Sequence, residues 1–261
     1  MNIWRRGLAS LALGASLMVA SLAAMAAPVT QLGFALDGSG SVSTSDYNLL
    51  RGGLTAALAG LPTDGSVEIS VVAYGSGTTL VVAPTVLTAA SLPTIQAAIT
   101  ASAKANGSTN TSGAITALSN AMTGSANFAD PGTRSIINLA TDGFPDSQSA
   151  AVAAAVAANA AGIDGLSIEA IGSGVSSPSA LNNLAAIAFP GPATILALNS
   201  TTIPNPLGGS GSWVVPVSDF TALAPVLLAK VQAAITPVPE PASLALFTVA
   251  LAGLAAARRR A

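Results

Sequence analysis

Short apolar runs alternate with amphipathic segments from residue 30 to residue 235. The apolar runs predict strands, because each is brief, rich in β-branched residues and bounded by turn residues. These predicted strands are Thr30–Leu36, Val67–Tyr74, Thr78–Ala83, Arg134–Ala140, Leu166–Ile171 and Trp213–Val217. Strands and helices that alternate in this way indicate a mostly parallel sheet with helices on both faces.

Apolar residues at helical spacing predict the helices between these strands. The first starts in the Ser43–Asp46 segment, whose side chains suit a helix N-terminus, and ends before Pro62. The others are Ser91–Ala103, Ser112–Met122, the alanine-rich Ser147–Ala161, Pro178–Ala188 and Thr221–Ile235, the last capped by Asp219. The Phe189–Gly211 segment, rich in Pro, Gly, Asn and Thr, predicts a long surface loop.

The predicted fold class is therefore α/β, with a doubly wound, mostly parallel central sheet similar to a Rossmann fold. The Gly75-Ser76-Gly77 turn leads into Thr78–Ala83, which predicts one antiparallel edge strand. Phe34 and Trp213 are expected in the core.

Polar residues follow the first predicted strand in the sequence Asp37-Gly38-Ser39-Gly40-Ser41. One carboxylate and two hydroxyls therefore stand at the carboxyl end of a strand, where open α/β sheets bind ligands. The intervening glycines allow a tight turn that can bring the hydroxyls together. Oxygen ligands suit Mg²⁺, Mn²⁺ or Ca²⁺ rather than zinc or copper. Taken alone, the same residues are also compatible with an ordinary Ser/Gly turn.

Two further motifs extend this pattern. Gly107-Ser108-Thr109-Asn110-Thr111-Ser112-Gly113 precedes a predicted helix, and Leu139-Ala140-Thr141-Asp142-Gly143 ends a predicted strand. In this order, Asp-x-Ser-x-Ser, Gly-x-Thr-x-Thr and Thr-Asp-Gly resemble the von Willebrand factor type A (vWA) domain family, over about residues 30–235. That family carries a metal-ion-dependent adhesion site (MIDAS).

The resemblance implies a set of metal ligands. The hydroxyls of Ser39, Ser41 and Thr109 would bind the metal directly, and Asp37 and Asp142 would bind it directly or through water. Few carboxylates and several hydroxyls favour Mg²⁺ over Ca²⁺ or Mn²⁺. The last coordination position would accept a carboxylate from a protein or an acidic polysaccharide.

Three further residues lie close to these ligands in the sequence. Thr111 is expected either to hydrogen-bond a ligand carboxylate or to cap the helix that follows. Asp146 precedes the alanine-rich helix, so we favour an N-terminal capping role over a place beside the metal. Thr141 is expected to pack against the backbone rather than to bind the metal.

The N-terminus predicts export. Residues 1–26 contain Arg5 and Arg6, an apolar stretch and the Ala24-Met25-Ala26 cleavage pattern of a signal peptide. A retained membrane anchor is the alternative interpretation. The vWA domain is then expected to span residues 27–236.

The C-terminal segment, residues 237–261, has three parts. Pro239-Glu240-Pro241 is followed by the apolar segment Ala242–Ala257 and by Arg258, Arg259 and Arg260. This pattern resembles the PEP-CTERM sorting signal, which implies processing by a membrane exosortase in a Gram-negative bacterium of the kind that makes exopolysaccharide. The apolar part is short for a membrane span, so it predicts a weak, transient inner-membrane anchor, or one that is retained.

Composition restricts the function. Only 8% of the residues are charged, against about a quarter in an ordinary domain. Loss of the signal peptide and of the terminal arginines would leave four basic residues against eleven acidic ones, Glu240 included, and so a net charge near −7, which argues against nucleic-acid binding. The chain has no histidine and no cysteine, so it has no Ser-His-Asp or Cys-His apparatus. A glycosidase pair of Asp142 and Asp146 is less favoured, because Asp142 has a better role as a metal ligand.

The sequence therefore predicts an exported, non-enzymatic binding module at the cell surface or in the extracellular matrix. The alternative is a structural matrix protein in which the metal only stabilises the fold.

Overall fold

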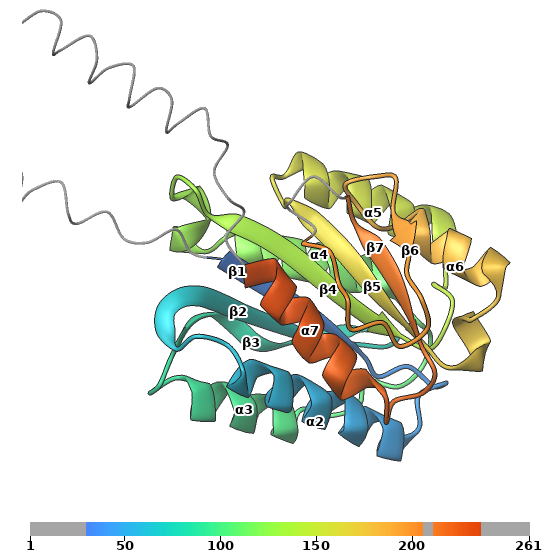
Figure 1. Ribbon diagram of the computed structural model, residues 1–261, viewed down its shortest axis with the longest axis horizontal. Helices are drawn as coiled ribbons and strands as arrows, with labels where there is room; N and C mark the ends of the chain where they lie inside the picture. Colours follow the sequence, from blue (N-terminus) through green and yellow to red (C-terminus); the bar gives the residue numbers. More distant parts are fainter. Residues whose placement is uncertain (1–29, 206–210, 236–261) are drawn as a thin grey trace, which may run out of the picture.

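The computed structural model describes residues 30–205 and 211–235. A seven-stranded sheet forms its centre, in the order β3-β2-β1-β4-β5-β7-β6 (Figure 1). The strands are β1 (Thr30–Asp37), β2 (Asp64–Tyr74), β3 (Thr78–Thr88), β4 (Arg134–Thr141), β5 (Gly165–Ile171), β6 (Thr194–Ile195) and β7 (Trp213–Val217). All neighbouring pairs are parallel except β2 and β3, so the predicted fold class is confirmed.

Helices cover both faces of the sheet (Figure 1). One face carries α2 (Thr44–Ala59), α3 (Leu92–Ala101) and α7 (Leu223–Ile235), and the other carries α4 (Thr111–Thr123), α5 (Gln148–Ala160) and α6 (Pro178–Ala185). Two short 3₁₀ helices, η1 (Ala126–Ala129) and η2 (Ser173–Val175), lie in connections. Both hydrophobic cores are built from residues between Leu32 and Ile235, so the segment 27–236 contains the whole described fold.

Several element bounds differ from the sequence-based expectations. β2 begins at Asp64 rather than Val67, and α6 ends at Ala185 rather than Ala188. β3 continues to Thr88 instead of ending at Ala83, because an edge strand tolerates the proline at position 84. The segment 189–211, expected to be a loop, contains the two-residue strand β6, which is too short to show a periodicity. α7 begins at Leu223 rather than Thr221, since Asp219 binds the amides of Thr221 and Ala222 in a turn before the helix.

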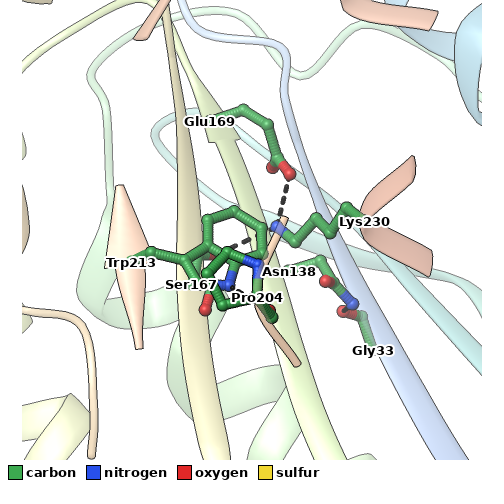
Figure 2. A network of polar contacts seen from close by, with 7 residues as sticks. All are labelled: Gly33, Asn138, Ser167, Glu169, Pro204, Trp213 and Lys230. Carbon is green, nitrogen blue, oxygen red and sulfur yellow. Dashed lines mark hydrogen bonds and ion pairs between the residues drawn. The ribbon is translucent and has the colours of Figure 1, made fainter. Parts of the chain in front are cut away.

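A buried ion pair joins the last helix to the sheet (Figure 2). Lys230 on α7 is 1% exposed and Glu169 on β5 is fully buried. The lysine Nζ lies 2.5 Å from Glu169 Oε1 and 4.7 Å from the centre of the Trp213 ring, and it donates to the carbonyl oxygen of Ser167 at 3.2 Å. Burial raises the pKa of Glu169 and lowers the pKa of Lys230, while the attraction between the two charges opposes both shifts.

We predict that Lys230→Met lowers the free energy of unfolding by about 3–5 kcal/mol, because it leaves the Glu169 carboxylate buried without its counter-ion. Adding Glu169→Leu should recover much of this loss, since neither charge of the pair then remains in the core. Urea unfolding of the segment 27–236 can be followed by the fluorescence of Trp213, its one tryptophan. A single variant as stable as the wild type would contradict the prediction.

Candidate metal site

Asp37 is the last residue of β1 and is fully buried. Its Oδ1 accepts a hydrogen bond from the backbone amide of Ser39 at 2.9 Å. Its Oδ2 accepts one from the hydroxyl of Thr141 at 2.7 Å. One donor on each oxygen fixes the plane of the carboxylate, while lone pairs remain for a further ligand.

The serine hydroxyls of the first motif lie beside Asp142. Ser39 Oγ is 3.0 Å from Ser41 Oγ, and Ser41 Oγ donates to Asp142 Oδ1 at 2.6 Å. A Cβ atom placed on Gly143 would lie 3.3 Å from Thr109 Oγ1 and 3.5 Å from Ser41 Oγ. These two hydroxyls therefore lie close to the same point, and the structure brings all three sequence motifs together.

Strand register explains the meeting of the first and third motifs. β1 lies between β2 and β4 and is parallel to both, with Leu36 opposite Ala140. The next residues are therefore Asp37 on β1 and Thr141 on β4, and the loops that follow them leave the sheet at the same edge. Sequence analysis predicted both loops but not their pairing.

Backbone hydrogen bonds hold the second motif against the first. Gly40 N donates to Gly107 O at 2.8 Å, and Asn106 N donates to Gly38 O at 2.6 Å. Asn110 N donates to Gly75 O in the β2–β3 turn at 3.1 Å. Thr109 is thereby held by main-chain contacts, so its hydroxyl is not needed to anchor the loop.

Gly107 makes this close approach possible. Its φ of +81° lies in the left-handed region, which other residues rarely adopt. A side chain at this position would also collide with the hydroxyl of Ser76. A glycine is therefore required for both the conformation and the contact.

The roles expected for Thr111 and Asp146 as helix caps belong to their neighbours. Asn110 caps α4 by accepting from Gly113 N at 2.9 Å, whereas Thr111 is buried at the first position of the helix. Ser147 caps α5 by accepting from Ala150 N. Asp146 instead connects with the second motif: its amide donates to the carbonyl of Thr109, and its carboxylate accepts from Ser108 Oγ at 3.4 Å.

Sequence reasoning missed two contacts of the site. Thr141 was expected only to pack, yet its hydroxyl orients the Asp37 carboxylate. Lys104 was not singled out, yet its Nζ donates to Ser39 O at 2.7 Å and to Asn106 Oδ1 at 2.9 Å. Both contacts depend on which strands and loops are neighbours, a property that local patterns do not contain.

The electrostatics of the site favour a cation. Burial raises the pKa of Asp142, as do the negative charges of Asp37 and Asp46, and the hydrogen bond from Ser41 partly offsets the shift. Two carboxylates and three hydroxyls form a hard oxygen set, which suits a divalent ion. No group of three or more His, Cys, Asp or Glu side chains with metal-binding geometry occurs among the described residues.

The predicted signal peptide and the sorting-tail residues Pro239 to Arg260 lie outside the described residues. Within the described parts of the chain, no helix has the length and apolar character needed to cross a membrane.

Comparison with known families gives two matches. Residues 31–202 match the von Willebrand factor type A domain, and residues 237–260 match the PEP-CTERM protein-sorting motif. The second match marks an exported protein that is processed at its C-terminus. No curated protein matches the chain.

Several solved structures share the fold at low sequence identity. Proximal thread matrix protein 1 from the mussel byssus aligns with a TM-score of 0.61 and 18% identity, over 80% of this chain and 48% of that protein. The pilus adhesin SpaC from Lactobacillus rhamnosus GG aligns with a TM-score of 0.58 and 14% identity, over 80% of this chain and 30% of the adhesin. The manganese-loaded TRAP protein of Plasmodium vivax aligns with a TM-score of 0.51 and 18% identity, over 77% of this chain and 74% of that protein.

This chain therefore spans about half of the mussel protein and less than a third of the adhesin. Another structure of the mussel protein has a zinc-occupied MIDAS motif. It aligns with a TM-score of 0.58 and 17% identity, over 80% of this chain and 48% of that protein. At these identities the structures support the fold, and the family rests on the match to residues 31–202. With its sheet order and its three converging motifs, the chain belongs to the von Willebrand factor type A domain family.

Proposed function

We propose that this protein is an exported binding module that uses a divalent cation to hold an acidic group of a partner. The hydroxyls of Ser39, Ser41 and Thr109 bind the ion directly, and Asp37 and Asp142 bind it directly or through water. The observation that carries the proposal is the convergence of these oxygens at the carboxyl edge of the sheet. The module has no catalytic role.

The donor set explains why a partner would be needed. Hydroxyls carry no charge, so they leave the ion more electrophilic than a cage of carboxylates would. An open coordination position then favours an incoming carboxylate, from a protein or an acidic polysaccharide.

The donor set favours Mg²⁺ as the ion, because Mg²⁺ is usually bound through one or two carboxylates and keeps several waters. Asp37 and Asp142 are the two carboxylates of this set, and neutral hydroxyls supply its other oxygens.

We place this module at the cell surface or in the extracellular matrix of a Gram-negative bacterium. The sorting motif at residues 237–260 supports this location. An exosortase would process the tail after its apolar segment had anchored the chain transiently in the inner membrane. The vWA-fold neighbours include a pilus adhesin and a thread matrix protein.

The second candidate is a structural matrix protein in which the metal only stabilises the domain. The similarity to a matrix protein of the mussel byssus favours it. In that case, removal of the metal would lower the melting temperature but release no partner.

The first test is calorimetric titration of the segment 27–236 with Mg²⁺, Mn²⁺ and Ca²⁺. We expect saturable binding, and we expect Mg²⁺ to bind more tightly than Mn²⁺ or Ca²⁺. Asp37→Ala should abolish binding, because it removes the buried carboxylate. Asp130→Ala, an exposed aspartate in the turn after η1, is the control and should bind normally. A folded wild type that binds none of the three ions would refute the proposal.

A second prediction concerns Thr141. Thr141→Val removes the hydroxyl that orients Asp37 but keeps a similar volume, so we expect metal affinity to fall by about tenfold or more. The control is Thr116→Val, which removes an exposed hydroxyl on α4. Calorimetry gives the affinity, and circular dichroism verifies the fold. Equal affinity in the two variants would mean that the Thr141 hydrogen bond has no role in metal binding.

A further inference from the structure

Beyond the metal itself, charged side chains surround the site. We propose that Asp46 and Asp146 make the site selective for a protein partner whose metal-binding carboxylate is flanked by basic side chains, and that they disfavour an acidic polysaccharide. This inference rests on the proposed function and specifies its partner.

Each of the two carboxylates is attached to a different ligand-bearing loop. Asp46 Oδ2 accepts a hydrogen bond from Ser43 Oγ at 2.7 Å, and Ser43 follows the ligand residue Ser41 by two positions. Asp146 is tied to the Thr109 loop by its amide and by the contact with Ser108 Oγ. Asp146 is exposed and Asp46 is half-buried, so an incoming ligand meets negative charge beside two of the loops.

A charge balance follows from these positions. Asp37 and Asp142 together cancel the two positive charges of a bound divalent ion. Asp46 and Asp146 then add two negative charges, against the single positive charge of Lys104, which is already bonded to Ser39 O and Asn106 Oδ1. The loaded site therefore has an excess of one negative charge around its electrophilic centre.

The other basic residues of the described chain make their contacts outside the ligand-bearing loops. They are Arg51, Arg134 and Lys230, against ten acidic residues in the same parts of the sequence. Arg51 binds the carbonyls of Thr100 and Ser102 at the end of α3. Arg134 begins β4 at the opposite edge of the sheet, and Lys230 is buried with Glu169.

These charges treat the two partner classes differently. A polymer of acidic sugars carries a carboxylate on each unit, so the units next to the bound one would face Asp46 and Asp146. Such charges interact over a Debye length of about 8 Å at physiological salt. A protein carboxylate with lysine or arginine neighbours would instead be attracted, and specificity arises from this difference in affinity.

The test uses the segment 27–236 at saturating Mg²⁺ and three probes. Two are peptides of equal length with one central aspartate, flanked either by lysines or by glutamates. The third is an oligogalacturonate with the same number of carboxylates as the glutamate peptide. We expect the wild type to bind the lysine-flanked peptide most tightly, and this affinity to fall as salt is raised.

The decisive variant is Asp46→Asn/Asp146→Asn. It should bind the lysine-flanked peptide about three- to tenfold more weakly and the oligogalacturonate more tightly, since each exposed charge pair makes a modest contribution. The control Asp64→Asn/Asp130→Asn makes the same change in net charge near the amino ends of β2 and β4, away from the site. It should bind all three probes as the wild type does.

Either of two results would overturn the inference: a wild type that does not prefer the lysine-flanked peptide, or a decisive variant that behaves like the control. Titration with Mg²⁺ alone, without any probe, separates these results from failure of the proposed function. A domain that binds Mg²⁺ but shows no such preference loses only the inference, whereas one that binds no Mg²⁺ loses both.

Discussion

The parallel pairing of β1 with both β2 and β4 is the constraint on which the site depends. It places the end of β1 between two neighbouring strand ends, with Leu36 opposite Ala73 and Ala140. The backbone amide of Gly38 then donates to Tyr74 O, and the hydroxyl of Thr141 donates to the carboxylate of Asp37. A shift of one residue in the β1–β4 pairing would turn the side chains of the shifted strand to the other face and would separate Asp37 from Thr141.

Main-chain hydrogen bonds leave the functional side chains available. The loop with Thr109 is held through the backbones of Gly38, Gly40 and Gly75, without use of its hydroxyl. Ser39, Ser41 and Asp142 bind chiefly one another. The loops can therefore keep their shape if a cation replaces the hydrogen bonds among these oxygens, as we propose, and a metal site requires such preorganisation.

In a chain with so few charges, each buried acidic residue has a distinct partner. Glu68 accepts hydrogen bonds from Gln31, Ser125 and Asn127, and Glu169 pairs with Lys230. Within residues 30–205 and 211–235, Asp37 accepts from two neutral donors, Ser39 N and Thr141 Oγ1, and the ion pair found there does not involve it. Burial of a charge without compensation is costly, so this difference agrees with our proposal that a metal ion is the counter-charge of Asp37.

The sequence by itself determined the fold class, the order of the long elements and the motifs with Asp37, Thr109 and Asp142, because periodicity and turn chemistry are local properties. Only the tertiary structure decided the neighbours of those motifs: the Thr141 bond to Asp37, the Lys104 contact, the placement of Asp146 against the Thr109 loop and the pairing of Lys230 with Glu169. These contacts join residues far apart in sequence, and their geometry follows from strand order and register, which no local pattern specifies.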